Sequence, residues 1–144
     1  MVIAIGSDHA GFHLKEKVKA FLSGKGYTVS DKGCFSEERV DYPDFAREVC
    51  AEITNNRARF GILICGSGNG ISIAANRNKG IRCALCWNAD VAALARQHND
   101  ANIISLPARF IESGEAEHIL TAFFEADFEG GRHKERVDKI DRQA

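Results

Sequence analysis

The stretch "GILICGSGNGISIAANR", residues 61–77, decides the expected fold of this 144-residue chain. An apolar run from Gly61 to Ile64 ends in Cys65, and glycines follow at the alternate positions 66, 68 and 70. A new helical pattern then begins at Ile71. A buried strand that passes through a glycine turn into a helix is typical of a βαβ unit, whose strands run parallel.

The rest of the chain repeats this alternation of short apolar strands and amphipathic helices. Strands are expected at 2–6, 27–31, 60–65, 81–86 and 102–106. Helices are expected at 12–22, from Pro43, at 71–77, after caps at Asn88 and Ser113, and at 132–140. We therefore predict one domain over residues 1–144 with an α/β fold, a doubly wound three-layer αβα sandwich. Its five-stranded parallel sheet is expected to have the order 2-1-3-4-5, with an extra C-terminal helix.

Composition and charge exclude several classes of protein. The chain is 44% hydrophobic and 27% charged with a net charge of −1, so no overall field favours nucleic acid or an anionic membrane. No apolar run approaches the roughly 20 residues needed to span a bilayer. The start "MVIAIGSDHAG" has no basic leader, and five cysteines are an odd number without disulfide-scaffold density. A cytoplasmic location is therefore expected.

Cys83 and Cys86 form a CxxC pattern inside the strand-like run "GIRCALCW". Side chains of a strand alternate between faces with period two, so positions three apart point to opposite faces. A zinc or redox pair is disfavoured by this geometry, and we interpret both cysteines as small core residues.

Two polar turns are expected to face one crevice. In a doubly wound sheet of this order, ligands bind at the switch point between strands 1 and 3, beyond the carboxyl ends of the strands. Strand 1 ends in "GSDHAG", which contains Asp8 and His9, and strand 3 ends in "CGSGNG". Asp8 and His9 are therefore site candidates, although a helix-capping Asp and a surface His are the alternatives.

The second turn carries Cys65 and a run of exposed backbone amides. A helix N-terminus attracts negative charge, which suits a cysteine that reacts as its thiolate, and the amides of "GSGNG" can bind an oxyanion. The alternative is a buried strand-end cysteine. The loop matches neither the Walker pattern nor GxGxxG, because Gly70 comes too early.

His98 closes an apolar helical stripe that contains Val91, Leu94 and Ala95. A lone histidine on such a face is more often a hydrogen-bonded core residue than a catalytic group, and both interpretations stay open on these residues alone.

Arg132 and Arg136 lie four residues apart on the last expected helix, so both guanidinium groups share one face. Arginine matches phosphate in a bidentate way. The alternative is a solvated charged face. Because this helix offers only Val137 and Ile140 for burial, a role toward a ligand or partner is the more plausible one.

These segments together resemble the ribose-5-phosphate isomerase B family, which also contains galactose-6-phosphate and allose-6-phosphate isomerases. The resemblance covers essentially the whole chain. It rests on six motifs in order: "GSDHAGFHLK", "DKG" (31–33), "DYPDFA" (41–46), "GILICGSGNGISIAANR", "RQHNDANI" (96–103) and "EGGRHKERV" (129–137).

The resemblance implies a role for each matching residue. Cys65 is similar to the base that moves a proton between C1 and C2, and His98 to the acid that opens the furanose ring. No metal or other cofactor is implied. The further substrate contacts that it implies are Asp8, His9, the pocket wall Tyr42, the enediolate-binding loop of Gly66, Ser67, Gly68, Asn69 and Gly70, then Asn99 and Arg109, and the phosphate-binding pair Arg132 and Arg136.

The implied function is an aldose–ketose isomerase of the pentose phosphate pathway. It would interconvert ribose 5-phosphate and ribulose 5-phosphate through ring opening and an enediolate. A six-carbon substrate, allose or galactose 6-phosphate, is the alternative within the family. The resemblance also implies a homodimer or a dimer of dimers with the site at the subunit interface.

Two other classes compete with an isomerase. Low-molecular-weight cysteine phosphatases also place Cys and a phosphate loop at the end of a strand, but their Cys-x₅-Arg pattern needs Arg at position 71, which is Ile here. A non-catalytic sugar-phosphate-binding protein is the other. Deuterium exchange at C2 in D₂O separates it from an isomerase, because a pure binder would not promote exchange.

Overall fold

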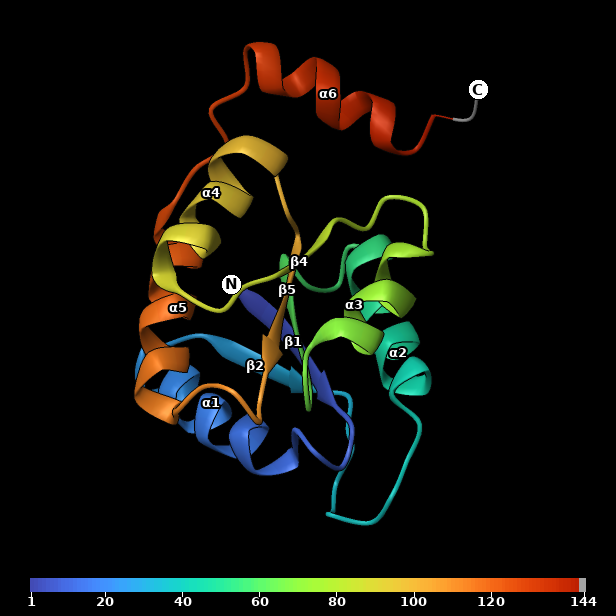
Figure 1. The fold of residues 1–144 in the computed structure, drawn as a ribbon, viewed down its shortest axis with the longest axis vertical. Helices are drawn as coiled ribbons and strands as arrows, with labels where there is room; N and C mark the ends of the chain where they lie inside the picture. Colours follow the sequence, from blue (N-terminus) through green and yellow to red (C-terminus); the bar gives the residue numbers. More distant parts are fainter. Residues whose placement is uncertain (143–144) are drawn as a thin grey trace.

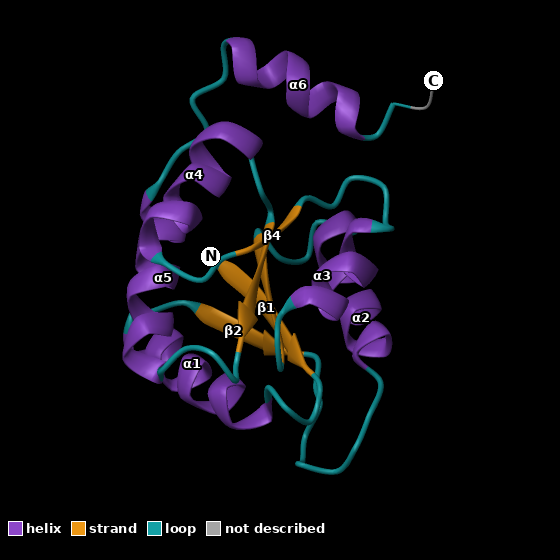
Figure 2. Ribbon diagram, in the orientation of Figure 1, coloured by secondary structure: helices purple, strands orange, loops and turns teal. Residues whose placement is uncertain are grey.

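The computed structural model describes residues 1–142 as an αβα sandwich, shown along the chain in Figure 1 and by element type in Figure 2. A five-stranded, all-parallel sheet forms the middle layer. Its strands are β1 (Val2–Ser7), β2 (Thr28–Asp31), β3 (Phe60–Cys65), β4 (Cys83–Leu85) and β5 (Ile103–Pro107). The α/β class and the layers are confirmed.

Helices follow the strands in the expected alternation. They are α1 (Phe12–Gly24), α2 (Tyr42–Thr54), α3 (Asn69–Asn76), α4 (Ala89–Asn99), α5 (Ser113–Glu125) and α6 (Arg132–Ile140). Asn88 caps α4 as predicted, since its Oδ1 accepts a hydrogen bond from the Val91 amide at 2.8 Å. The predicted Ser113 cap is wrong. Glu112 is the N-cap of α5 and forms a capping box with Glu115. The Glu112 carboxylate accepts from the Glu115 amide, and Glu115 Oε1 accepts from the Glu112 amide at 3.4 Å.

The strand order is 2-1-3-5-4, so the predicted order 2-1-3-4-5 is wrong at one edge of the sheet. β5 pairs with β3 on one side and β4 on the other. All five residues of β5 are buried, whereas β4 has three residues of which only Cys83 is buried. A central strand must be covered on both faces, which the longer apolar β5 satisfies and the short β4 does not. The switch point between β1 and β3 is unchanged.

Two clusters of buried side chains fill the two faces of the sheet. One joins the sheet to α1, α4 and α5, and the other joins it to α2 and α3. Consecutive residues of β3 belong to opposite clusters: Ile64 lies on the first side and Cys65 on the second. Cys86 and Cys83 are also divided between the two clusters, which confirms that this CxxC pair belongs to the core.

α6 stands at the end of the molecule above α4 and apart from the sheet (Figure 1). Its far end is attached through Asp141, whose Oδ2 accepts a hydrogen bond from the Gly80 amide at 2.9 Å. Ile140 is 55% exposed and the buried residue of α6 is His133, so the helix presents a mostly polar surface. Within residues 1–142, no helix combines the length and apolarity that crossing a membrane requires.

Candidate active site

The carboxyl ends of β1 and β3 lie side by side and carry the first group of candidate residues. Ser7 pairs with Ile64, and the Asp8 amide then donates to the Ile64 carbonyl at 3.2 Å. The buried Asp8 carboxylate accepts a hydrogen bond from the Gly11 amide at 3.1 Å. Asp8 thus holds the turn before α1, although the N-cap residue itself is Gly11. This turn brings Asp8 next to the residue that precedes Cys65.

Gly11 permits this close approach, and we expect Gly11→Ala to destabilise the protein. A Cβ at Gly11 would lie 2.5 Å from the Ile64 carbonyl oxygen and 2.8 Å from its carbon. Backbone atoms cannot move aside as the end of a side chain can, so the substitution is expected to lower the free energy of unfolding by about 1–3 kcal/mol. Urea unfolding measures it. Gly24→Ala is the matched control, since nothing lies within 4 Å of its Cβ position and its stability should be unchanged or slightly higher. Equal midpoints for the two variants would contradict the expectation.

The loop after Cys65 is shaped by its glycines. Gly68 has a φ of 78°, in the left-handed region that favours glycine, and is the N-cap residue of α3. The Ser105 hydroxyl donates to the Gly68 carbonyl at 3.1 Å, and the Ser67 hydroxyl accepts from the Asn69 amide at 3.2 Å. These bonds hold the loop open, with Cys65 buried at its base and the α3 amides ahead of it. A helix N-terminus of this kind stabilises negative charge.

Cationic and aromatic groups surround this loop. The Arg109 amide donates to the Gly66 carbonyl at 3.0 Å, and a Cβ on Gly66 would meet the Arg109 guanidinium at 3.1 Å. On the other side, a Cβ on Gly70 would lie 2.6 Å from the Tyr42 ring. The structure therefore brings the predicted residues Asp8, His9, Tyr42, Cys65, Gly66, Ser67, Gly68, Asn69, Gly70 and Arg109 to one edge of the sheet.

The other predicted residues lie at the opposite end of the sheet, where the strands begin. Cys65 pairs with Pro107 at the carboxyl end of β5, whereas His98 lies five residues before Ile103, at its amino end. Four residue steps of strand alone span about 13 Å. His98 and Asn99 end α4, next to Arg132 and Arg136 on α6. One chain therefore keeps the predicted base and the predicted ring-opening acid apart.

His98 belongs to a cluster that the sequence prediction missed. Its imidazole stacks on that of His133, and both Nε2 atoms approach Glu129 Oε1, at 3.8 Å for His98 and 3.6 Å for His133. Among residues 1–142, these three are the histidine, cysteine and carboxylate side chains whose donor atoms are grouped closely enough to hold a metal ion. The motif "EGGRH" contains both missed residues, but it was interpreted only through its arginine.

The apolar stripe predicted for α4 is also corrected. Leu94 is 45% exposed, and the buried residues of the helix are Ala92, Ala95 and Arg96. His98 consequently points toward α6 and the surface, with 38% of its side chain exposed, and is not a core histidine.

Burial keeps three cysteine thiols of the core unreactive at neutral pH. It raises the pKa of Cys50 to about 11 and the pKa values of Cys83 and Cys86 to about 12. These thiols stay protonated, as expected for core residues. Cys65 differs from them in its position, because it ends β3 and directly precedes the glycine loop that leads into α3.

Residues 3–140 match the Ribose/Galactose Isomerase family. The chain belongs to this family. Ribose-5-phosphate isomerase B of Escherichia coli strain K12 is 46% identical over 138 residues, which cover 96% of this chain and 93% of that protein.

Solved structures of the family share the fold over nearly the whole chain. A ribose 5-phosphate isomerase of Thermotoga maritima is 57% identical, with a TM-score of 0.96 and 97% of both chains covered. Ribose-5-phosphate isomerase B of Mycoplasma genitalium, solved with bound ribulose-5-phosphate, is 44% identical with a TM-score of 0.92. The match covers 96% of this chain and 93% of that one.

Proposed function

We propose that this protein interconverts ribose 5-phosphate and ribulose 5-phosphate. The carrying observation is the position of Cys65, buried at the switch point of the sheet with the α3 amides ahead of it and Arg109 beside the loop. Support comes from the family relatives that are named ribose-5-phosphate isomerase B, one of them solved with ribulose-5-phosphate.

The proposed chemistry uses each group for one task. His98 donates a proton to the ring oxygen. The anomeric hydroxyl, hydrogen-bonded to Asp8, loses its proton to water, and the bond between C1 and the ring oxygen breaks to give the open aldose. The Cys65 thiolate then removes the proton from C2 and returns it to C1. Amides of the loop from Gly66 to Gly70 stabilise the enediolate oxygen, and such donors contribute about 3 kcal/mol each where measured. The enediolate gains a proton on O1 from water and loses the proton of its O2 hydroxyl to water, and water reprotonates His98. The protein ends as it began, so the reaction consumes no cofactor.

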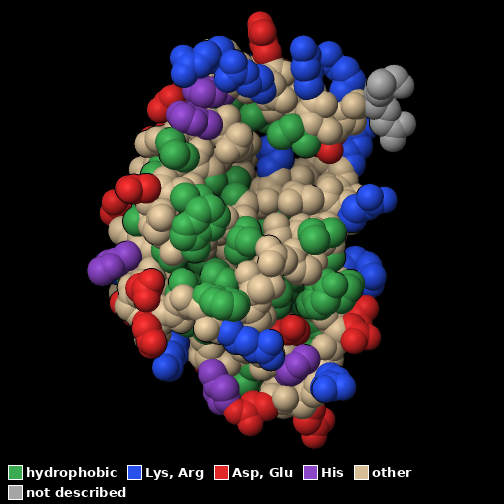
Figure 3. Space-filling view, viewed as in Figure 1, with side chains coloured by type: hydrophobic (Ala, Val, Ile, Leu, Met, Phe, Trp, Pro, Cys, Tyr) green, Lys and Arg blue, Asp and Glu red, His purple; other side chains and the backbone are tan. Residues whose placement is uncertain are grey.

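This mechanism needs a second copy of the chain. Because His98 lies at the sheet edge opposite Cys65, we propose a homodimer, or a dimer of dimers, in which the α4–α6 end of one copy packs over the Cys65 loop of another. Figure 3 supports this, since basic side chains gather along α6 and apolar ones are exposed on the same face below it. Trp87, Leu94 and Phe110 are exposed apolar side chains that such a contact could cover.

Arg132 and Arg136 are the proposed phosphate-binding pair, and Arg136→Ala is expected to weaken substrate capture. Both side chains are exposed on α6, as a ligand from outside this chain requires. Losing a charge-assisted hydrogen bond costs about 1.5–3 kcal/mol, or roughly 10- to 150-fold in kcat/KM. Steady-state kinetics measure this, and Arg142→Ala, an exposed arginine beyond α6, is the control. Kinetics identical to the wild type would indicate that the two arginines face solvent and do not bind the phosphate.

A substrate panel tests the proposed function. Purified protein is given ribose, allose and galactose phosphates, and ketose formation is followed together with deuterium uptake at C2 in D₂O. We expect the five-carbon substrate to have the highest kcat/KM. A preference for a six-carbon sugar would support the alternative substrate. Binding without exchange would instead identify a sugar-phosphate sensor. A cytoplasmic location, which the free cysteines suit, is part of the same proposal.

A further inference from the structure

Glu129 and His133 lie around His98, the catalytic candidate that is not at the carboxyl ends of the strands. His98 is in the last turn of α4, His133 in the first turn of α6, and Glu129 in the connection that precedes α6. The Glu129 amide donates to the Gln97 carbonyl at 3.0 Å, which fixes this connection against α4. Gly130 and Gly131 then turn the chain sharply, with φ values of 68° and 56°. Three segments are thus brought together around one imidazole.

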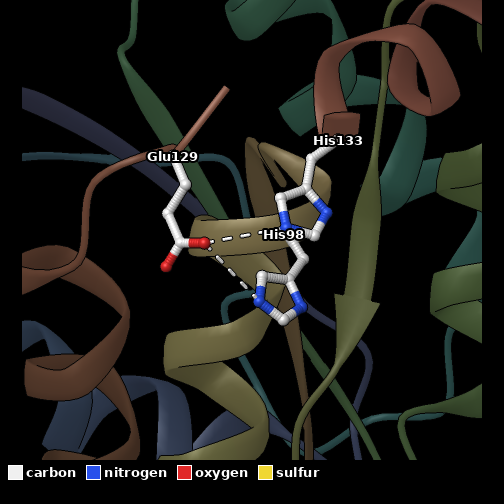
Figure 4. A group of neighbouring side chains, drawn as sticks. All are labelled: His98, Glu129 and His133. Carbon is white, nitrogen blue, oxygen red and sulfur yellow. Dashed lines mark ion pairs between the residues drawn. The ribbon is translucent and has the colours of Figure 1, made fainter. Parts of the chain in front are cut away.

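The stack of the two imidazoles restricts His98. The ring centroids lie 4.2 Å apart with 11° between the planes. Figure 4 shows the two rings next to each other, with Glu129 pointing toward both. The His133 side chain is 8% exposed and acts as a buried platform, whereas the His98 side chain is 38% exposed. One face of His98 is therefore covered, and its rotation about χ2 is limited while it remains accessible to a ligand.

Charge acts on the same ring. Glu129 Oε1 lies 3.8 Å from His98 Nε2, and His98 is at the C-terminal end of α4, where a positive charge is favoured. Burial lowers the pKa of His133, helped by the positive charges of His98, Arg132 and Arg136. A neutral His133 suits the stack, because two stacked imidazolium rings would repel each other. His133 Nε2 is buried without a hydrogen-bond partner within residues 1–142.

A metal ion would use the same three side chains less well. Zinc ligands place their donor atoms around one point at about 2.0–2.3 Å from the ion. An imidazole lone pair lies in the plane of its ring, and the two ring planes are stacked nearly parallel, so the lone pairs of the two rings do not converge on such a point. Arg132 and Arg136 on the same helix add positive charge nearby. These observations favour an imidazole held in place by its neighbours over a metal ligand.

We propose that Glu129 and His133 are positioning residues that hold His98 in one orientation for ring opening. The proposal rests on the proposed isomerase function. It gives α6 two roles: its arginines bind the phosphate, and His133 supports His98. His133 touches His98 and not the sugar. Its loss should therefore act on the step that His98 performs.

The experiment compares two reactions of the same protein. Conversion of ribose 5-phosphate requires ring opening, whereas deuterium exchange into ribulose 5-phosphate does not, and both substrates carry the phosphate. We expect His133→Ala to slow conversion by about ten- to a hundredfold, since small misplacements have effects of this size. Exchange should fall much less. His133→Phe, which retains an aromatic face, should restore much of the conversion. Glu129→Gln should lower conversion, while Glu135→Gln, an exposed glutamate on α6, should change neither reaction.

Several outcomes would overturn the proposal. Equal losses in conversion and exchange would show that His133 only docks α6 and its arginines. Unchanged conversion in both His133→Ala and Glu129→Gln would show that neither residue supports His98. Loss of wild-type conversion with a chelator, and recovery with zinc, would identify a metal site. The NMR signals of the His98 ring give a second test, because they should report a mobile ring in His133→Ala even if His98→Asn shows no role in ring opening. An unchanged His98 ring in that variant would reject the positioning role independently of the proposed function.

Discussion

Replacing Cys65 with alanine is expected to abolish isomerisation while the affinity for a phosphorylated ligand stays within several-fold of the wild type. In the proposed mechanism Cys65 acts on carbon, whereas the proposed phosphate-binding residues are arginines at other positions. A general base contributes roughly 10²–10⁴-fold, and Cys65 is the cysteine that ends β3 and directly precedes the glycine loop. Deuterium exchange into ribulose 5-phosphate measures the loss directly, and calorimetry with the same ligand measures binding.

Cys50→Ala is the matched control for this prediction. Cys50 is a buried residue of α2 whose Sγ lies 3.7 Å from the Ala75 carbonyl oxygen of α3. Its replacement should affect stability more than turnover. Near-normal exchange by the Cys65 variant would reject the cysteine as the base and leave another group of the loop to take that role. A loss of ligand affinity as large as the loss of turnover would instead indicate a collapsed loop.

Most of the fold followed from local pattern. The apolar run that ends in Cys65 corresponds to β3 without any shift of its bounds, and α6 also has the predicted bounds. Period two within a strand correctly placed Cys83 and Cys86 on opposite faces. Such features depend only on residues close in sequence. The order of β4 and β5 depends on which strand is buried more completely, and that competition is decided by packing between distant segments.

The candidate site was predictable only where the strands themselves place it. Asp8 and Cys65 follow paired strands, so sheet topology brings them together. His98 could not be located in this way, because its environment comes from α6 and the connection at Glu129. His133 was missed for the same reason: a histidine between two arginines resembles a solvated face until the helix packs on α4. Lys15 also owes its environment to a distant segment, because it is fully buried and its Nζ donates to Asp31 Oδ2 at 2.7 Å.

Replacing His98 with asparagine is expected to slow conversion of ribose 5-phosphate far more than it slows deuterium exchange into ribulose 5-phosphate. Ribose 5-phosphate is mostly a furanose and must be opened. Ribulose 5-phosphate cannot close a furanose ring, because its O5 carries the phosphate, so it needs only the Cys65 step. A general acid contributes about 10²–10⁴-fold, and conversion should fall within that range.

The comparison must be between exchange and net conversion, since an enzyme variant cannot change the final equilibrium between the two sugars. Asparagine retains a polar group of similar reach at the end of α4 but has no proton to give at neutral pH. Equal large losses in both reactions would show that His98 is not a dedicated ring opener. Urea unfolding of the same variant then decides between the two remaining roles. A lower midpoint would indicate that the stack on His133 stabilises the α4–α6 contact, and an unchanged midpoint would place His98 in the proton transfers of the enediolate.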